Sequence, residues 1–253
     1  QYRMVADVPV GVFLSGGYDS SCVTSLLQAN STEKIKTFTI GSTDNKLDEA
    51  PFAKQIAAHL GTDHTEYYCT AKEALDIIPD LPYYFDEPFA DSSAIPTILV
   101  SRMARKKVTV ALSADAGDEI FAGYNRYDYI SRYGNKIKAI PKPFRKLAAA
   151  SMERISSTSI PVLKNKANFH SRYDKLKNLL RDPSTSTLLK NLNQVFTEKD
   201  VSKLFNKEVG ILTTLHTSDE LKKEHYDDLS FMMAVDYQTY MLDDILQKVD
   251  RAT

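Results

Sequence analysis

The sequence predicts an α/β fold in which a parallel sheet has helices on both faces and is followed by a helical subdomain. In the first half of the chain, short apolar runs alternate with amphipathic segments, which is the pattern of parallel strands joined by helices. After Tyr127 the strand pattern stops, and prolines separate helix-like segments. We therefore expect an α/β core over residues 1–127 and a helical subdomain over residues 128–253.

Four short apolar runs are the predicted strands. They are VGVFL at 10–14, IKTFTI at 35–40, HTEYYC at 64–69 and VTVALS at 108–113. Strands of a parallel sheet are buried on both faces and therefore read as nearly continuous apolar runs. Ligands of such sheets bind beyond the carboxyl ends of the strands, where loops lead into helices.

Three amphipathic segments, 20–28, 48–60 and 92–105, are the predicted helices between these strands. Apolar residues recur in each segment at the spacing that places them on one helix face. These residues are Val23, Leu26 and Leu27, then Phe52, Ile56 and Leu60, and finally Ile95, Leu99 and Met103. We expect the three faces to pack against the sheet.

In the second half of the chain, Thr217 and Glu220 have the spacing of a capping box. In this motif a hydroxyl group and a carboxylate bind the free N–H groups at the start of a helix. The sequence predicts that a long helix follows, running through Met232 and Met233 toward Leu242.

Composition argues against several classes of function. Lys and Arg number 32 and Asp and Glu 33, so the chain as a whole does not attract nucleic acid or an anionic membrane. The excess of Lys and Arg between Arg126 and Lys190 indicates a solvated helical surface. The two cysteines, Cys22 and Cys69, lack zinc-type spacing, which favours a reducing, cytoplasmic setting. No run approaches the ~18 apolar residues of a membrane span.

The segment LSGGYDSS, from Leu14 to Ser21, follows the first predicted strand. Gly16 and Gly17 allow positive φ and a close approach of backbone N–H groups to a ligand, and a helix N-terminus favours negative charge. Hydroxyl donors come from Ser15, Ser20 and Ser21. Asp19 nevertheless places a carboxylate inside this anion-binding arrangement. The segment has no lysine and matches neither GxxxxGK[ST] nor GxGxxG.

Taken alone, this segment has two interpretations. In one, the glycines make a tight turn and Asp19 caps the next helix. In the other, the loop binds a ligand that explains both the glycines and the carboxylate. The position directly after a buried strand favours ligand binding.

Several segments, taken in order, resemble one known family. The loop and the strand before it resemble the PP-loop of the ATP pyrophosphatases, and the surrounding sequence resembles the synthetase domain of glutamine-hydrolysing asparagine synthetases. The matching segments are MVADVPVGVFLSGGYDSS at 4–21, FTIG at 38–41, LDEAPFAKQIAAHLGTDH at 47–64, DEPFADSSAIPT at 86–97, LSADAGDEIFAGYNRY at 112–127 and DDILQKVDRAT at 243–253.

The resemblance implies a reaction in two steps. ATP adenylates the side-chain carboxylate of aspartate with release of pyrophosphate, and ammonia then displaces AMP to form the amide. It also explains Asp19 as a ligand of a Mg²⁺ ion that bridges the phosphates, with Asp118 as the second carboxylate. Both acids follow strands at one edge of the sheet, so they can converge. Alternatively, Asp118 and Glu119 cap the helix through Phe121.

The resemblance assigns further roles by position. Leu14, Ile40, Ser113 and Ala114 match positions that hold the adenosine of ATP. Asp115 matches an acidic position that handles the acyl-adenylate and the incoming amine, where general base action fits. The alternatives are that Ile40 belongs only to the core and that Asp115 is an exposed loop acid.

The segment after the fourth strand departs from the family pattern SGxGxDExFxGY. Ala114, Ala116 and Ala122 stand where the family usually has glycine. If any of these positions requires positive φ, alanine there costs on the order of 1 kcal/mol or more. The same alanines leave open one competing function, a non-catalytic remnant that binds nucleotide or a partner.

We expect the sequence to be a fragment or a processed product of a longer protein, because it opens on Gln1 in the middle of a pattern. The resemblance implies a preceding glutaminase domain with a cysteine nucleophile, which neither Cys22 nor Cys69 replaces. It also implies a later lysine beyond Thr253, so this chain alone is expected to bind nucleotide and make little amide. Lys248, Asp250 and Arg251 are expected to serve in packing or, at most, in substrate contact.

Two further enzyme classes compete with the asparagine synthetase interpretation. One is a related amidotransferase that acts on another carboxylic acid, such as a sugar acid, since the loops say little about the acceptor. The other is a tRNA-modifying PP-loop enzyme, against which the absence of catalytic or zinc-type cysteines and of a basic excess argues. The expected partners are thus aspartate or another small acid, ammonia and the glutaminase domain, and a homodimer is among the arrangements considered.

Overall fold

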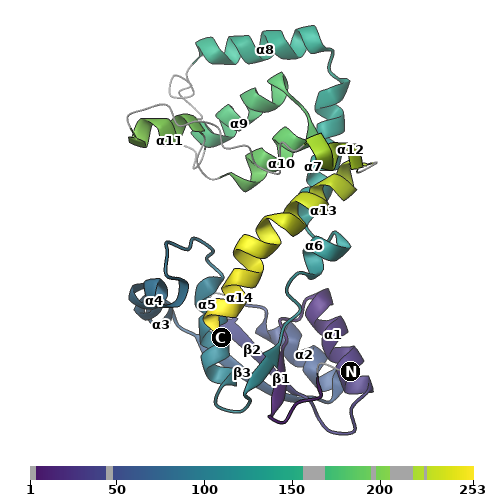
Figure 1. Ribbon diagram of the computed structural model, residues 1–253, viewed down its shortest axis with the longest axis vertical. Helices are drawn as coiled ribbons and strands as arrows, with labels where there is room; N and C mark the ends of the chain where they lie inside the picture. The colour runs from purple at the N-terminus through teal and green to yellow at the C-terminus, as the bar shows by residue number, and fades with distance from the viewer. Residues whose placement is uncertain (1–3, 44–47, 156–168, 195–197, 206–218, 225–226) are drawn as a thin grey trace. The chain divides into compact units, whose positions relative to one another are not determined.

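The computed structural model describes residues 4–43, 48–155, 169–194, 198–205, 219–224 and 227–253 (Figure 1). The chain divides into two compact units. The first comprises Gln1–Asp118 and Tyr240–Thr253, and the second comprises Glu119–Thr239. This division differs from the expected boundary after residue 127, because the C-terminal residues pack with the α/β core rather than with the helical unit.

Four parallel strands form the sheet of the first unit, in the order β3-β2-β1-β4. The strands are β1 (Val10–Phe13), β2 (Lys36–Ser42), β3 (Asp63–Cys69) and β4 (Val110–Leu112). In the sheet, Val12 pairs with Thr37 on one side and with Leu112 on the other. All four predicted strands are present, and the predicted α/β class is confirmed.

Helices lie on both faces of this sheet, with α2 and α5 in direct contact with the strands, and further helices of the unit pack around them. These helices are α1 (Tyr18–Ala29), α2 (Ala50–Leu60), α3 (Ala71–Ile77), the 3-10 turn η2 (Ile78–Asp80), α4 (Leu81–Phe85), α5 (Ala94–Ala104), the π-helical segment η5 (Met241–Leu246) and α14 (Gln247–Ala252). On one face Phe38 packs with Val100 and Ala104 of α5. On the other, Leu14 packs with Ala53 of α2.

The buried faces of α1 and α2 differ in part from the predicted ones. Leu26 and Phe52 are 61% and 63% exposed. The buried residues are instead small: Ser20 and Thr24 in α1, and Ala50, Ala53 and Ala57 in α2. Of the other predicted residues, Val23, Leu27, Ile56 and Leu60 are partly buried, and Ile56 packs against the buried cluster that contains Ala53. Small side chains let a helix approach its neighbours closely, so the most buried positions lie beside the predicted large apolar residues. In α5, by contrast, the predicted Leu99 is buried.

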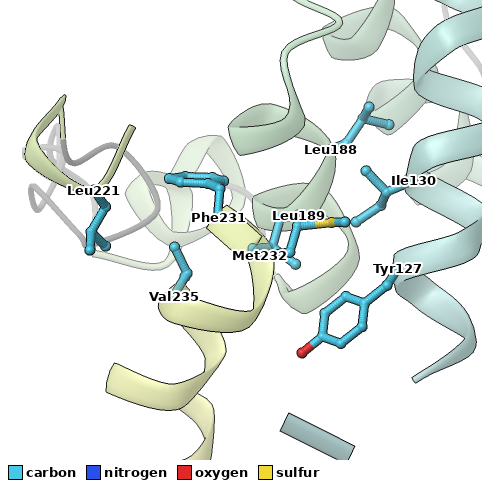
Figure 2. Close-up of a cluster of buried hydrophobic side chains, with 8 residues drawn as sticks. All are labelled: Tyr127, Ile130, Leu188, Leu189, Leu221, Phe231, Met232 and Val235. Atoms are coloured by element: carbon cyan, nitrogen blue, oxygen red, sulfur yellow. The ribbon is translucent and has the colours of Figure 1, made fainter. Parts of the chain in front are cut away.

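In the part that the structure describes, the second unit contains helices and no strand. Its helices are α7 (Asn125–Ala139), α8 (Lys142–Arg154), α9 (Phe169–Arg181), α10 (Thr185–Asn193), α11 (Glu198–Phe205), α12 (Asp219–Glu224) and α13 (Asp228–Gln238), and α6 (Gly117–Phe121) spans the boundary between the units. Figure 2 shows the buried cluster that residues of α7, α10, α12 and α13 form around Met232. The predicted helical subdomain is therefore present.

The start of the predicted long helix lies partly outside the described residues. Thr217, the first residue of the predicted capping box, lies outside the described residues. The helix that contains Met232 and Met233 begins instead after Asp227, whose side chain accepts a hydrogen bond from the N–H of Ser230 at 2.7 Å. None of the described helices combines the length and apolarity needed to cross a membrane.

Candidate active site

The first loop, Leu14–Ser21, leads from the carboxyl end of β1 into α1. Leu14 is buried and extends the sheet, because its N–H donates to the carbonyl of Phe38 at 2.9 Å. The hydroxyl of Thr39 donates to the carbonyl of Leu14. Gly16 then takes a φ of 88°, a left-handed conformation that glycine adopts without steric cost. The chain thus leaves the sheet at the residue type that the turn requires.

Hydroxyl groups hold the first loop in shape. The Oγ atoms of Ser15 and Ser20 lie 2.9 Å apart, and the N–H of Ser15 donates to Ser20 Oγ at 3.2 Å. Ser21 donates to the carbonyl of Gly17 at 2.6 Å. Ser20 is buried whereas Ser15 is exposed. Ser20 therefore holds the loop from its buried side, and the hydroxyl of Ser15 is accessible to solvent.

Residues 14–29 are all described, and within them no side chain caps the N-terminus of α1. Gly17 occupies the N-cap position, and Asp19 lies in the first turn. The alternative in which Asp19 acts as the N-cap residue therefore does not match the structure. Backbone N–H groups of a first helical turn have no partner within the helix, and they favour an anion together with the helix dipole.

The second loop, Ser113–Asp118, meets the first loop at Gly117. A methyl group added to Gly117 would lie 2.6 Å from Oδ2 and 2.7 Å from Cγ of Asp19. The carboxylate of Asp19 therefore lies directly against the backbone of the second loop, one residue before Asp118. The two predicted acids thus come from loops that are in contact, although about a hundred residues separate them in the chain.

Two of the alanines that replace the family's glycines have left-handed backbone conformations. The φ angle is 73° at Ala116 and 59° at Ala122, whereas Ala114 does not share this conformation. For an L-residue such a conformation costs on the order of 1–2 kcal/mol. Positions 116 and 122 therefore keep a backbone conformation that favours glycine, at a cost in strain, whereas position 114 does not.

The remaining predicted residues lie at the same edge of the sheet with different exposure. Ile40, Ser113 and Ala114 are partly buried, and Asp115 is exposed. Ile40 also packs against the buried clusters on the α5 face. Its predicted contact with adenosine and the alternative role in the core are therefore both compatible with the structure.

The donor set at the two loops decides which metal would fit. Among the described residues, no three His, Cys, Asp or Glu side chains are grouped as a metal cage. The carboxylate of Asp19 lies against the backbone of the second loop at Gly117, and Asp118, the second predicted ligand, is the next residue in that loop. A Mg²⁺ ion that arrives with a polyphosphate needs only one or two protein carboxylates, because phosphate oxygens and water complete its shell. The residues therefore fit a nucleotide-bound Mg²⁺.

A buried charged cluster lies at the start of α5, and of its members only Lys248 was named from the sequence, as a residue for packing or substrate contact. Lys248 Nζ lies 3.0 Å from Oδ2 of Asp91 and 2.7 Å from Oγ of Ser93. Burial raises the pKa of Asp244 to about 6, and the neighbouring charge of Asp91 adds to this effect. Burial also works to raise the pKa of Asp91, but hydrogen bonds from Ser93 and Lys248 outweigh it and lower that pKa. The only local indication of this cluster in the sequence was the presence of polar residues in the segments DEPFADSS and QKVDR.

A family model described as asparagine synthase matches residues 1–253. The chain belongs to the asparagine synthase family. Within that family it corresponds to the synthetase domain, as the ordered motifs and the α/β sheet indicated. The resemblance inferred from the sequence is thus confirmed.

Relatives with curated descriptions agree with the family. The chain is 32% identical over 256 residues to the glutamine-hydrolyzing asparagine synthetase 1 of Bacillus subtilis, covering 99% of this chain and 38% of that protein. It is 46% identical over 123 residues to a putative glutamine-hydrolyzing asparagine synthetase 2 of Methanocaldococcus jannaschii, covering 48% of this chain and 24% of that protein. This asparagine synthase-family chain therefore spans well under half the length of these relatives.

Proposed function

We propose that this chain is the synthetase domain of a protein that binds ATP, adenylates the side-chain carboxylate of aspartate and transfers ammonia to the activated acid, which yields asparagine, AMP and pyrophosphate. The observation that carries the proposal is the contact between Asp19 and Gly117. It brings a carboxylate of the first loop to the backbone of the second at the ligand-binding edge of a parallel sheet. Membership of the asparagine synthase family supports the reaction class.

In this proposal the two loops bind ATP. Backbone N–H groups at Gly16 and Gly17 and the hydroxyls of the first loop hold pyrophosphate oxygens at the N-terminus of α1. Leu14, Ile40, Ser113 and Ala114 surround the adenosine. Asp19 and Asp118 would hold Mg²⁺, which when bound supplies positive charge to neutralise the phosphates.

The chemistry consists of two displacements. First, a carboxylate oxygen of aspartate attacks the α-phosphorus of ATP, and the bond from that phosphorus to pyrophosphate breaks. Then the nitrogen of ammonia attacks the activated carbonyl carbon, the bond to the AMP oxygen breaks, and the nitrogen loses a proton. Asp115 is exposed on the second loop and would accept that proton as a general base.

Product analysis of the intact protein tests the proposal. The protein is incubated with ATP, Mg²⁺ and ammonium together with aspartate, a sugar acid or no acid, and nucleotides and amides are separated by chromatography. We expect AMP, pyrophosphate and asparagine in the aspartate reaction alone. AMP formation only with the sugar acid would identify the related amidotransferase, and ADP with phosphate as the main products would contradict the adenylation chemistry.

A further inference from the structure

Helix α14 holds the segment 86–93 at two points. At one end of the segment, Arg251 Nη1 lies 2.9 Å from Oδ2 of Asp86. At the other end, Lys248 Nζ contacts both Asp91 and Ser93. Lys248 and Arg251 are three residues apart in the helix, so their side chains leave the same face.

The two attachment points differ in burial. The side chains of Lys248 and Asp91 are 7% and 14% exposed, whereas those of Arg251 and Asp86 are 43% and 71% exposed. Exposed ion pairs contribute little because water and salt screen them. Loss of one partner from a buried pair leaves an uncompensated charge in a poorly solvated place. Lys248 is therefore the stronger of the two attachments.

Other contacts also restrain the segment. Asp86 has a φ of 60°, which turns the chain sharply at the end of α4. The rings of Phe85 and Phe89 stack with their centroids 4.3 Å apart. Asp91 accepts hydrogen bonds from the N–H and the hydroxyl of Ser93, each at 2.8 Å. The segment thus has a defined shape, although it contains neither helix nor strand.

Topology places this segment at the edge of the sheet that carries the two loops. The chain passes from β3 through residues 86–93 into α5 and returns to β4, which is parallel to the other strands. Helix α5 therefore runs back along the sheet, and its N-terminal end lies near the carboxyl ends of the strands. Ala94, Ile98 and Ala252 form one buried cluster, and Ile40 packs against it.

We propose that Lys248 is a positioning residue that fixes the segment 86–93, through Asp91 and Ser93, as the acceptor-acid side of the active site. In the proposed function the first and second loops bind ATP. The segment 86–93 lies at the same edge of the sheet and takes no part in that ATP site, so it can contact the acceptor acid. The catalytic part of this inference rests on the proposed function, whereas the mechanical part rests on the contacts alone.

Hydrogen exchange of the intact protein tests the mechanical part without reference to activity. Lys248→Met keeps the length of the side chain and removes its charge, and Lys106→Met is the matched control at an exposed lysine. In Lys248→Met we expect backbone amides of residues 86–93 to exchange about tenfold faster, with the first loop unchanged. In Lys106→Met both regions should exchange as in the wild type. Unchanged exchange of residues 86–93 in Lys248→Met would overturn the inference, whatever the substrate.

Kinetics test the catalytic part. For Lys248→Met we expect the KM for aspartate to rise about tenfold, while ATP affinity stays within about twofold of the wild-type value. Lys248→Arg keeps the charge and should recover most of the lost affinity.

The double variant Lys248→Met, Asp91→Asn removes the unpaired buried charge, so it should recover thermal stability but not the KM. Recovery of both would indicate a merely structural role and contradict positioning. If the wild-type protein forms no AMP in the presence of aspartate, the proposed function is refuted instead. Hydrogen exchange would then still test whether Lys248 holds the segment 86–93.

Discussion

The first and second loops leave neighbouring strands at one edge of the sheet, yet they meet their backbone requirements with different residues. The first loop has glycine where φ is positive, with 88° at Gly16, and the second has alanine, with 73° at Ala116. At Gly16 space is also limiting, because an added methyl group would lie 2.8 Å from the backbone nitrogen of Ala53. The comparison teaches that steric crowding makes a glycine indispensable, whereas an unfavourable φ alone can be tolerated as strain.

The largest expected effect is the loss of the carboxylate from the first loop. In Asp19→Ala we expect Mg²⁺-dependent ATP affinity to fall on the order of 100-fold, because the phosphate charge loses a metal ligand. Titration calorimetry with and without Mg²⁺ measures it. Equal affinity for the wild type and the variant would remove the metal role of Asp19.

The next effect separates the two glycines of the first loop. Gly16→Ala should reduce the free energy of unfolding by about 2 kcal/mol or more, since it combines a left-handed φ with a backbone clash. Gly17→Ala is the matched control, because Gly17 has a φ of -71° and the nearest atom to an added methyl group is 3.4 Å away. Urea unfolding compares the two variants. Equal losses would mean that position within the loop, and not space and φ, sets the requirement.

A smaller effect is expected at the contact between the loops. In Gly117→Ala the new methyl group would displace the carboxylate of Asp19, which is the end of a movable side chain. We expect Mg²⁺-dependent ATP affinity to fall about tenfold while the fold is kept. Calorimetry and circular dichroism report the two quantities. Wild-type affinity in this variant would show that the position of Asp19 against Gly117 is unimportant for binding.

The smallest effect concerns the strained alanine. Ala116→Gly relieves about 1–2 kcal/mol of strain, but glycine adds about 0.4–1 kcal/mol of chain entropy to the unfolded state. The net result should be a gain in stability of roughly 0.5 kcal/mol. Ala114→Gly is the control and should lose stability, because Ala114 has no positive φ to relieve. Thermal unfolding of both variants checks the opposite signs.

The sequence predicted the sheet and the first loop because their signals are local, whereas the residues of the second loop were identified through the family resemblance. Apolar runs, glycines and the serine-rich turn each occupy a few consecutive residues, and parallel topology then places both loops at one edge. The buried faces of α1 and α2 were not predictable from large apolar residues, since close packing selects Ser20, Thr24 and alanines instead. The pairing of Lys248 with Asp91 joins residues 157 positions apart, and no local pattern contains such a contact.

The most direct test of the central claim, that the two loops form one ATP site, is a double-mutant cycle. Mg²⁺-dependent ATP affinity is measured by calorimetry for the wild type, Asp19→Ala, Asp118→Ala and the double variant. If both acids hold the same ion, each single variant should lose most of the Mg²⁺ dependence, and the double variant should bind little more weakly than either. Losses that simply add would show two independent sites and contradict the account.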